Sequence, residues 1–130
     1  MSAKNEPKYK MLKNYSISFF KYRLFRIVAL KDFETHDGRK VKRGDLGGFI
    51  ETEDNLSQEG TCWIFKNAKV FAGGKVRDDA IICGYALVYD YAEVMGRSIV
   101  HNSATVYKHA KLIDGEVKAG DVHTGPGAKN

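Results

Sequence analysis

Small side chains recur at every sixth position over the middle and C-terminal parts of the chain, and an aliphatic residue follows each of them two places later. The small set runs from Cys62 to Ala110, and the aliphatic set runs from Ile64 to Leu112. An α-helix places residues i and i+6 on different faces, so this period cannot produce an amphipathic helix. Short strands of β-branched residues separated by turns satisfy it. The pattern therefore predicts a β-solenoid.

The N-terminal part lacks this period and shows hairpin signals instead. Residues 22–30 form a mostly apolar run that predicts a strand, and residues 13–20 fit either a strand or a helix. Asp37-Gly38 is a strong hairpin turn signal, because both central positions of a type I′ turn need a positive φ. We expect a basic tail over residues 1–12, a β-hairpin region over 13–49, a β-helix over 50–120 and a C-terminal tail over 121–130.

Two boundary positions complete this division of the chain. Ile50 and Leu56 continue the six-residue phase backwards from Cys62, so the first coil is expected to begin near residue 50. The last segment, EVKAGD, has Glu116 where a small residue is expected. We interpret this break as the end of the core.

The repeat CWIFKN, AKVFAG, GKVRDD, AIICGY and onwards resembles the hexapeptide-repeat superfamily, the left-handed parallel β-helices. The lead-in GDLGGFIETEDNLSQEGTCW resembles small hexapeptide-like proteins of phages and prophages. The resemblance covers about half of the chain. It implies an all-β, single-domain fold of about three coils, with three hexapeptides in each coil, capped by the N-terminal hairpin. Residues eighteen apart would then lie above one another, with the small and aliphatic positions pointing inward.

Under this arrangement two outward faces are unexpectedly apolar. One carries the columns Trp63, Ile81, Ile99 and Phe65, Cys83, His101; the other carries Phe71, Tyr89, Tyr107 and Lys69, Leu87, Thr105. Exposed apolar patches usually mark interfaces. We therefore expect a protein partner or a second copy of the chain, as a dimer or trimer, to bind at Trp63, Phe65, Phe71, Ile81, Leu87, Tyr89, Ile99 and Tyr107. Two alternatives stay open: the N-terminal hairpin could cover one face, and the aromatic column could simply stabilise the coil.

Charge is concentrated at the N-terminal end of a chain whose formal net charge is +5. Residues 1–43 hold twelve Lys and Arg side chains against four acidic ones. Such asymmetry can mark a basic surface for nucleic acid, although an ordinary solvated surface explains it as well. The candidate nucleic-acid contacts are Lys21, Arg23, Arg26, Arg39, Lys40, Lys42 and Arg43.

The residues offer little catalytic chemistry. Enzymes of the hexapeptide superfamily are mostly acyltransferases whose base is a His near a subunit boundary, and that resemblance makes His101 and His109 the alternative catalytic candidates. The two are expected on different faces, so they would not converge on a metal. GDLGGF lacks the phosphate-loop pattern, and neither cysteine has a CxxC partner. We expect no metal and no cofactor.

Three functional hypotheses follow. The first is a non-enzymatic interaction module in the cytoplasm, in concrete form a phage-encoded, anti-CRISPR-like inhibitor that occupies a bacterial defence complex; this form rests on analogy alone. The second is a minimal hexapeptide acyltransferase, and the third is nucleic-acid binding through the N-terminal region. No apolar run is long enough to span a membrane, and two cysteines are too few for a disulfide framework.

Overall fold

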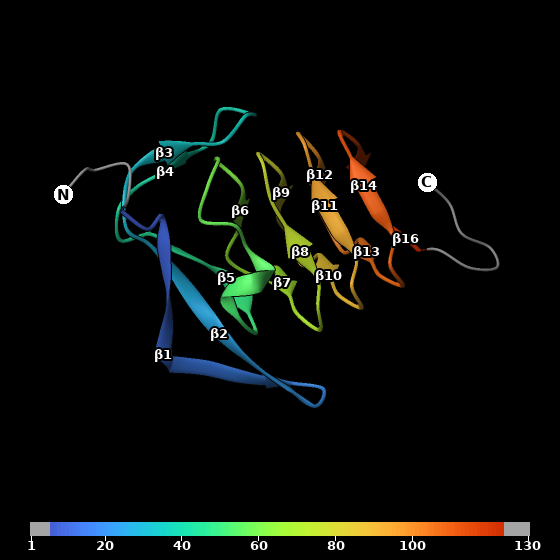
Figure 1. Ribbon diagram of the computed structural model, residues 1–130, viewed down its shortest axis with the longest axis horizontal. Helices are drawn as coiled ribbons and strands as arrows, with labels where there is room; N and C mark the ends of the chain where they lie inside the picture. Colours follow the sequence, from blue (N-terminus) through green and yellow to red (C-terminus); the bar gives the residue numbers. More distant parts are fainter. Residues whose placement is uncertain (1–5, 124–130) are drawn as a thin grey trace.

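The computed structural model describes residues 6–123 and contains strands, turns and one short 3-10 helix at Glu53–Asn55. The strands are β1 Tyr9–Phe19, β2 Tyr22–Ala29, β3 Phe33–Glu34, β4 Lys40–Val41, β5 Leu46–Ile50, β6 Trp63–Ile64, β7 Lys69–Val70, β8 Lys75–Val76, β9 Ile81–Ile82, β10 Leu87–Val88, β11 Glu93–Met95, β12 Ile99–Val100, β13 Thr105–Val106, β14 Lys111–Ile113, β15 Glu116–Val117 and β16 Asp121–Val122. Figure 1 shows the short strands stacked coil upon coil, with a long hairpin at the N-terminal end. Within this part of the chain no helix is long and apolar enough to cross a membrane. The predicted all-β solenoid with an N-terminal hairpin is confirmed.

The solenoid is built from three columns of parallel strands. Val70 pairs with Val88 and Val88 with Val106, at the predicted spacing of eighteen residues. The other two columns run β6-β9-β12-β15 and β8-β11-β14. The side chains of the small and aliphatic sets point inward and are buried along the whole repeat, so the inward phase read from the sequence is correct.

The first coil is longer than the expected eighteen residues, and the last coil is shorter. Ile50 pairs with Val70 and Leu56 bridges to Val76, each twenty residues apart. Ile50 and Leu56 therefore occupy the aliphatic position of the repeat. The sequence interpretation placed them in the series of small residues that begins at Cys62, which is wrong. At the other end Val117 pairs with Val100 and Val122 with Val106, seventeen and sixteen residues apart. The core consequently continues past Glu116 to Val122, and the coils number about four where three were expected.

The N-terminal hairpin is continuous with one face of the solenoid. β1 and β2 pair antiparallel, β2 pairs antiparallel with β5, and β5 pairs in parallel with β7. One seven-stranded sheet results, in the order β1-β2-β5-β7-β10-β13-β16. The second hairpin, β3–β4, turns at the predicted Asp37-Gly38, where Gly38 has a φ of 92°. Asp37 does not have a positive φ, so the expected type I′ geometry is wrong. The hairpins thus protect the first coil from edge-to-edge pairing.

The expected basic tail is shorter than residues 1–12, because Lys8 and Tyr9 are buried. The Lys8 ammonium donates to the carbonyl oxygen of Cys62 at 2.7 Å and more weakly to those of Gly60 and Glu59 at 3.3 and 3.4 Å. Burial lowers the pKa of Lys8. The ammonium satisfies carbonyl groups at the open end of the first coil, so this segment forms part of the cap.

Candidate functional site

A groove of about 820 Å³ opens on one side of the solenoid. Three segments line it: residues 20–22 at the tip of the β1–β2 hairpin, residues 51–55 around the 3-10 helix, and the solenoid corners at residues 71–75 and 89–91. In Figure 1 the hairpin runs obliquely beneath the first coils, which brings its tip towards these corners. The groove therefore depends on contacts between the N-terminal region and the solenoid.

The hairpin tip holds a phenylalanine in an unfavourable conformation. Phe19 pairs with Tyr22, leaving Phe20 and Lys21 as a two-residue turn. Phe20 has a φ of 53° and is 82% exposed, and its ring lies 4.7 Å from that of Phe19. The left-handed region costs an L-residue about 1–2 kcal/mol, and a turn of this kind usually carries Gly or Asn at such a position. An exposed ring is thus held at the rim of the groove.

Two stacked columns of rings reach the solenoid side of the groove, where Phe71, Tyr89 and Tyr91 line it. Phe71 stacks on Tyr89 at 5.1 Å and Tyr89 on Tyr107 at 5.5 Å, with rings parallel to within 4° and 9°. In the same corner as Tyr89, Tyr91 stacks on His109 at 5.3 Å. The period of eighteen residues repeats these rings directly above one another. Burial raises the pKa of Tyr89, helped by its neighbour Tyr107.

Carboxylates and two lysines complete the lining. Glu51 accepts a hydrogen bond from the backbone N–H of Ala72 at 2.9 Å, which fixes that carboxylate. The carboxylates of Asp54 and Asp90 form no side-chain hydrogen bond or ion pair with another residue of the described part of the chain. The Lys21 ammonium lies 5.6 Å from the ring centroid of Tyr22.

A buried asparagine positions the acidic side of the groove. Asn55 Oδ1 accepts from the backbone N–H groups of Glu51 and Thr52 at 2.9 and 2.8 Å, and its Nδ2 donates to the Gly74 carbonyl at 2.8 Å. Thr52 caps the 3-10 helix by accepting from the N–H of Asp54. This network ties the turn that carries Asp54 to the solenoid corner, so the spacing across the groove is fixed.

The two candidate histidines lie in different surroundings. His101 Nε2 lies 3.1 Å from a carboxylate oxygen of Glu116, out of line for a hydrogen bond, and its side chain is 24% exposed. His109 is exposed, stacks on Tyr91, and donates its backbone N–H to the Asp90 carbonyl at 2.9 Å. His109 therefore contacts two residues that line the groove. No group of three or more potential metal ligands occurs between residues 6 and 123.

Several residues expected to bind a partner are covered by the chain itself. Trp63 is buried and packs edge-on against Phe33 of β3 at 5.3 Å. Phe71 is buried against Phe19 and Tyr22 of the β1–β2 hairpin at 5.5 and 5.2 Å. Ile81 is buried as well. All three side chains are buried within the chain, contrary to the exposed surface expected of them, and separate hairpins cover Trp63 and Phe71.

The remaining members of that set are partly exposed: Phe65, Leu87, Tyr89, Ile99 and Tyr107. Leu87 and Tyr89 pack against the cluster of Leu24, Phe49 and Phe71 beneath the β1–β2 hairpin. Phe65 lies beneath the Arg39 guanidinium, 4.8 Å from ring centroid to Cζ. The partly exposed apolar surface thus lies mainly over the later coils.

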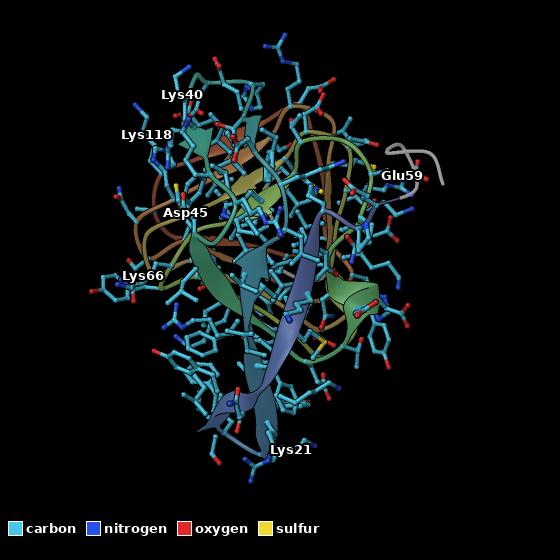
Figure 2. The ribbon with its side chains drawn as sticks, turned by 90° about the vertical axis from the view of Figure 1, so that its left-hand side faces the viewer. Lys21, Lys40, Asp45, Glu59, Lys66 and Lys118 are labelled. Carbon is cyan, nitrogen blue, oxygen red and sulfur yellow. The ribbon has the colours of Figure 1, made fainter. Side chains whose placement is uncertain are left out.

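The basic residues do not gather into one surface. Arg26 is buried, donates to the carbonyls of Gly47 and Lys66 at 2.7 and 3.0 Å, and lies over the ring of Phe49. It is a structural residue, so its expected exposure to nucleic acid is wrong. Figure 2 places Lys21 and Lys40 at opposite ends of the molecule.

Five further basic candidates are exposed but differ in their partners. Arg39 pairs with Asp37 at 2.9 Å, and Lys40 pairs with Glu34 at 3.2 Å. Arg23 donates to the Ser16 hydroxyl at 2.9 Å. Lys42 and Arg43 lie in the turn before β5. A continuous basic strip for nucleic acid is therefore not formed by these residues.

The sequence interpretation missed the groove itself. Phe20, Asp54, Asp90 and Tyr91 were not among its candidates. One signal for Phe20 was present: a bulky residue stands between two β-strand segments, where a tight turn favours Gly or Asn. The aspartates carried no such signal, because single acidic residues in solenoid turns are ordinary solvated side chains.

Comparison with known proteins supplies one similarity. Models of known protein families find no match in the chain. Over 67 residues the chain is 36% identical to the uncharacterized acetyltransferase YdcK of Escherichia coli (strain K12). The aligned part covers 51% of this chain and 19% of that protein, so the chain spans about a fifth of its relative. The six-residue period, the stacked coils and this similarity together support a protein of the hexapeptide β-helix type.

Proposed function

We propose that this chain is an acyl-transfer protein of the hexapeptide β-helix type, which moves an acyl group from a thioester such as acetyl-CoA to an amine or hydroxyl. The observation that carries the proposal is the 36% identity to a protein named as an acetyltransferase, over half of the present chain. Because the chain spans about a fifth of that relative, the activity is inferred for this chain and is not transferred from the whole protein.

The groove is the candidate acceptor site and His109 the candidate general base. Its volume of about 820 Å³ falls within the range of small-molecule pockets. In the proposed reaction the amine nitrogen or hydroxyl oxygen of the acceptor attacks the thioester carbonyl, and the His109 imidazole takes a proton from that attacking atom. The tetrahedral intermediate then expels the thiolate, which receives the proton back as a free thiol. His109 does not line the groove itself but stacks on Tyr91, which does. His101, which lies beside Glu116, is the comparison residue.

The test has a binding stage and a turnover stage. Acetyl-CoA should raise the melting temperature of the chain, because a ligand at a hundredfold excess over its Kd stabilises by about 2.7 kcal/mol. Free thiol should then accumulate when a panel of primary amines and alcohols is added. His109→Gln should lower that rate at least tenfold while leaving the acetyl-CoA shift in place, and His101→Gln should not. Absence of any thermal shift would contradict the proposal.

A second candidate function is protein binding through the half-exposed residues Leu87, Tyr89 and Tyr107. The observation that favours it is the parallel ring stack, which continues beyond the hairpin onto the later coils. Tyr89→Glu should leave the coil folded but abolish self-association in light scattering. If wild type is monomeric, self-association through these residues is excluded. The narrower hypothesis of a phage-encoded inhibitor gains no support from the fold or from the similarity.

A further inference from the structure

We propose that the groove binds a small organic cation, an aliphatic primary amine in its ammonium form. The first argument is the nature of its walls. Phe20 and Tyr91 are among the most exposed large rings of the described chain, and both line the groove together with Tyr22 and Tyr89. Ring faces attract ammonium groups through their quadrupole. The Lys21 ammonium already lies over the Tyr22 ring at 5.6 Å, so a ring of this groove does accept a cation.

Charge gives the second argument. The side chains that line the groove include the carboxylates of Glu51, Asp54 and Asp90 and the ammonium groups of Lys21 and Lys75. Three acids against two bases leave one net negative charge in a chain whose overall formal charge is +5. Asp54 and Asp90 have no side-chain partner between residues 6 and 123, whereas Glu51 is held by the N–H of Ala72. Unpaired carboxylates beside aromatic rings favour a cation over an anion or a neutral ligand.

The hairpin tip gives the third argument. Phe20 keeps a φ of 53° and an exposed ring, although glycine would relieve the backbone and remove the exposed apolar surface. The Phe20 ring packs edge-on against Phe19 at 4.7 Å but stays 82% exposed, while Phe19 itself anchors the hairpin on Phe71 at 5.5 Å. A ligand-contacting role at the rim of the groove accounts for its retention.

Size decides between a small molecule and a macromolecule. The groove of about 820 Å³ is within the range of about 300–1,000 Å³ typical of small-ligand pockets. It is also bounded on three sides by the hairpin tip, the 3-10 helix and the solenoid corners. We therefore commit to a free small amine as the occupant. The inference deepens the proposed function, because such an amine would be the acyl acceptor once its ammonium group has lost one proton to solvent and regained a lone pair. The binding step stands without acyl transfer.

The test uses hexylamine as the probe and hexanol as its uncharged match. Binding is measured by two-dimensional ¹H–¹⁵N NMR of the full chain without acetyl-CoA. At about 10 mM, an accessible range for weak ligands, hexylamine should shift the signals of residues 20–22, 51–55 and 89–91, while hexanol should not. Equal shifts from both probes, or no shift from hexylamine, would overturn the proposal.

Two conservative variants locate the site. Asp90→Asn removes one charge at a φ of 57°, a conformation that Asn accepts readily, and should weaken hexylamine about fivefold. Phe20→Gly should also weaken it about fivefold while leaving the melting temperature equal or higher. Tyr85→Ala removes a ring that is 67% exposed and does not line the groove, and should change nothing. Unchanged affinity in both groove variants would refute the site.

These measurements separate the two proposals. If hexylamine binds and acetyl-CoA gives no thermal shift, the cation site stands and the acyl-transfer proposal fails. If acetyl-CoA binds and hexylamine does not, the acyl-transfer proposal survives with a different acceptor, and the amine inference is wrong.

Discussion

Replacing Phe71 by alanine tests whether this ring holds the β1–β2 hairpin on the solenoid or binds a partner. Its side chain is 1% exposed and forms the centre of a cluster with Leu24 and Phe49 beneath the β1–β2 hairpin. It contacts the rings of Phe19, Tyr22 and Tyr89 at centroid distances of 5.5, 5.2 and 5.1 Å. The ring contacts that Tyr15 and Tyr9 of β1 make with Phe49 and Trp63 are longer, at 6.2 and 6.5 Å. Phe71→Ala should therefore loosen the hairpin as well as the coil.

The expected magnitude follows from the burial. A fully buried Phe→Ala change costs about 3–5 kcal/mol, from lost transfer energy and the cavity left behind. This is a large part of a total stability of about 5–15 kcal/mol for a domain of ordinary size. Urea denaturation should show a lower midpoint with little change in slope if unfolding stays two-state. Trypsin should also cut faster at Lys21 and Arg23, because the hairpin opens more often.

The control is Tyr85→Ala, which removes a solvent-exposed ring in a turn and should change the stability by less than about 0.5 kcal/mol. The reasoning would be refuted by a Phe71→Ala protein whose stability lies within about 1 kcal/mol of wild type. If that protein stayed equally stable but lost an oligomer or a partner, the original interpretation of Phe71 as an interface residue would be correct instead.

Three further predictions concern the core, the entry to the solenoid and the cap. Val88→Asp should unfold the coil, because it places an unpaired carboxylate between Val70 and Val106. The cost is several kcal/mol, about the size of the whole stability. Circular dichroism would show the loss of structure, and a native spectrum would contradict the prediction. Gly48→Ala should destabilise measurably in thermal melts, since its Cβ would lie 2.7 Å from the Phe65 carbonyl and closer still to that of Ala68; an unchanged melting temperature would mean that β5 can shift. Tyr9→Phe tests the pH dependence. Burial raises the pKa of Tyr9 in the folded protein above its unfolded value of 10.0. The contribution of Tyr9 to the free energy of unfolding is therefore full below pH 10 and falls by about 1.4 kcal/mol per pH unit above it. The difference in unfolding free energy between wild type and Tyr9→Phe should shrink between pH 10 and 12, and a constant difference would contradict the assignment.

The amino-acid sequence alone determined the repeating part of this protein. Inward small and aliphatic residues at a period of six specify short strands, turns and their stacking, because each coil is a local unit that repeats the same constraint. The pairing of Val70, Val88 and Val106 follows directly from that period. The Asp37-Gly38 hairpin was predictable for the same reason, since turn chemistry is local. His101 and His109 could likewise be assigned to different faces.

The tertiary structure decided what lies on the outside of the coils and where they end. An outward Trp63 or Phe71 has the same sequence signature whether a partner, water or the chain's own hairpin covers it, and only long-range packing selects the hairpin. The coils at both ends depart from eighteen residues, and backbone pairing tolerates such changes as long as Leu56 and Val122 reach their columns. The groove joins the hairpin tip at Phe20 to segments about thirty to seventy residues further along the chain, as far as Tyr91, so no local pattern could predict it.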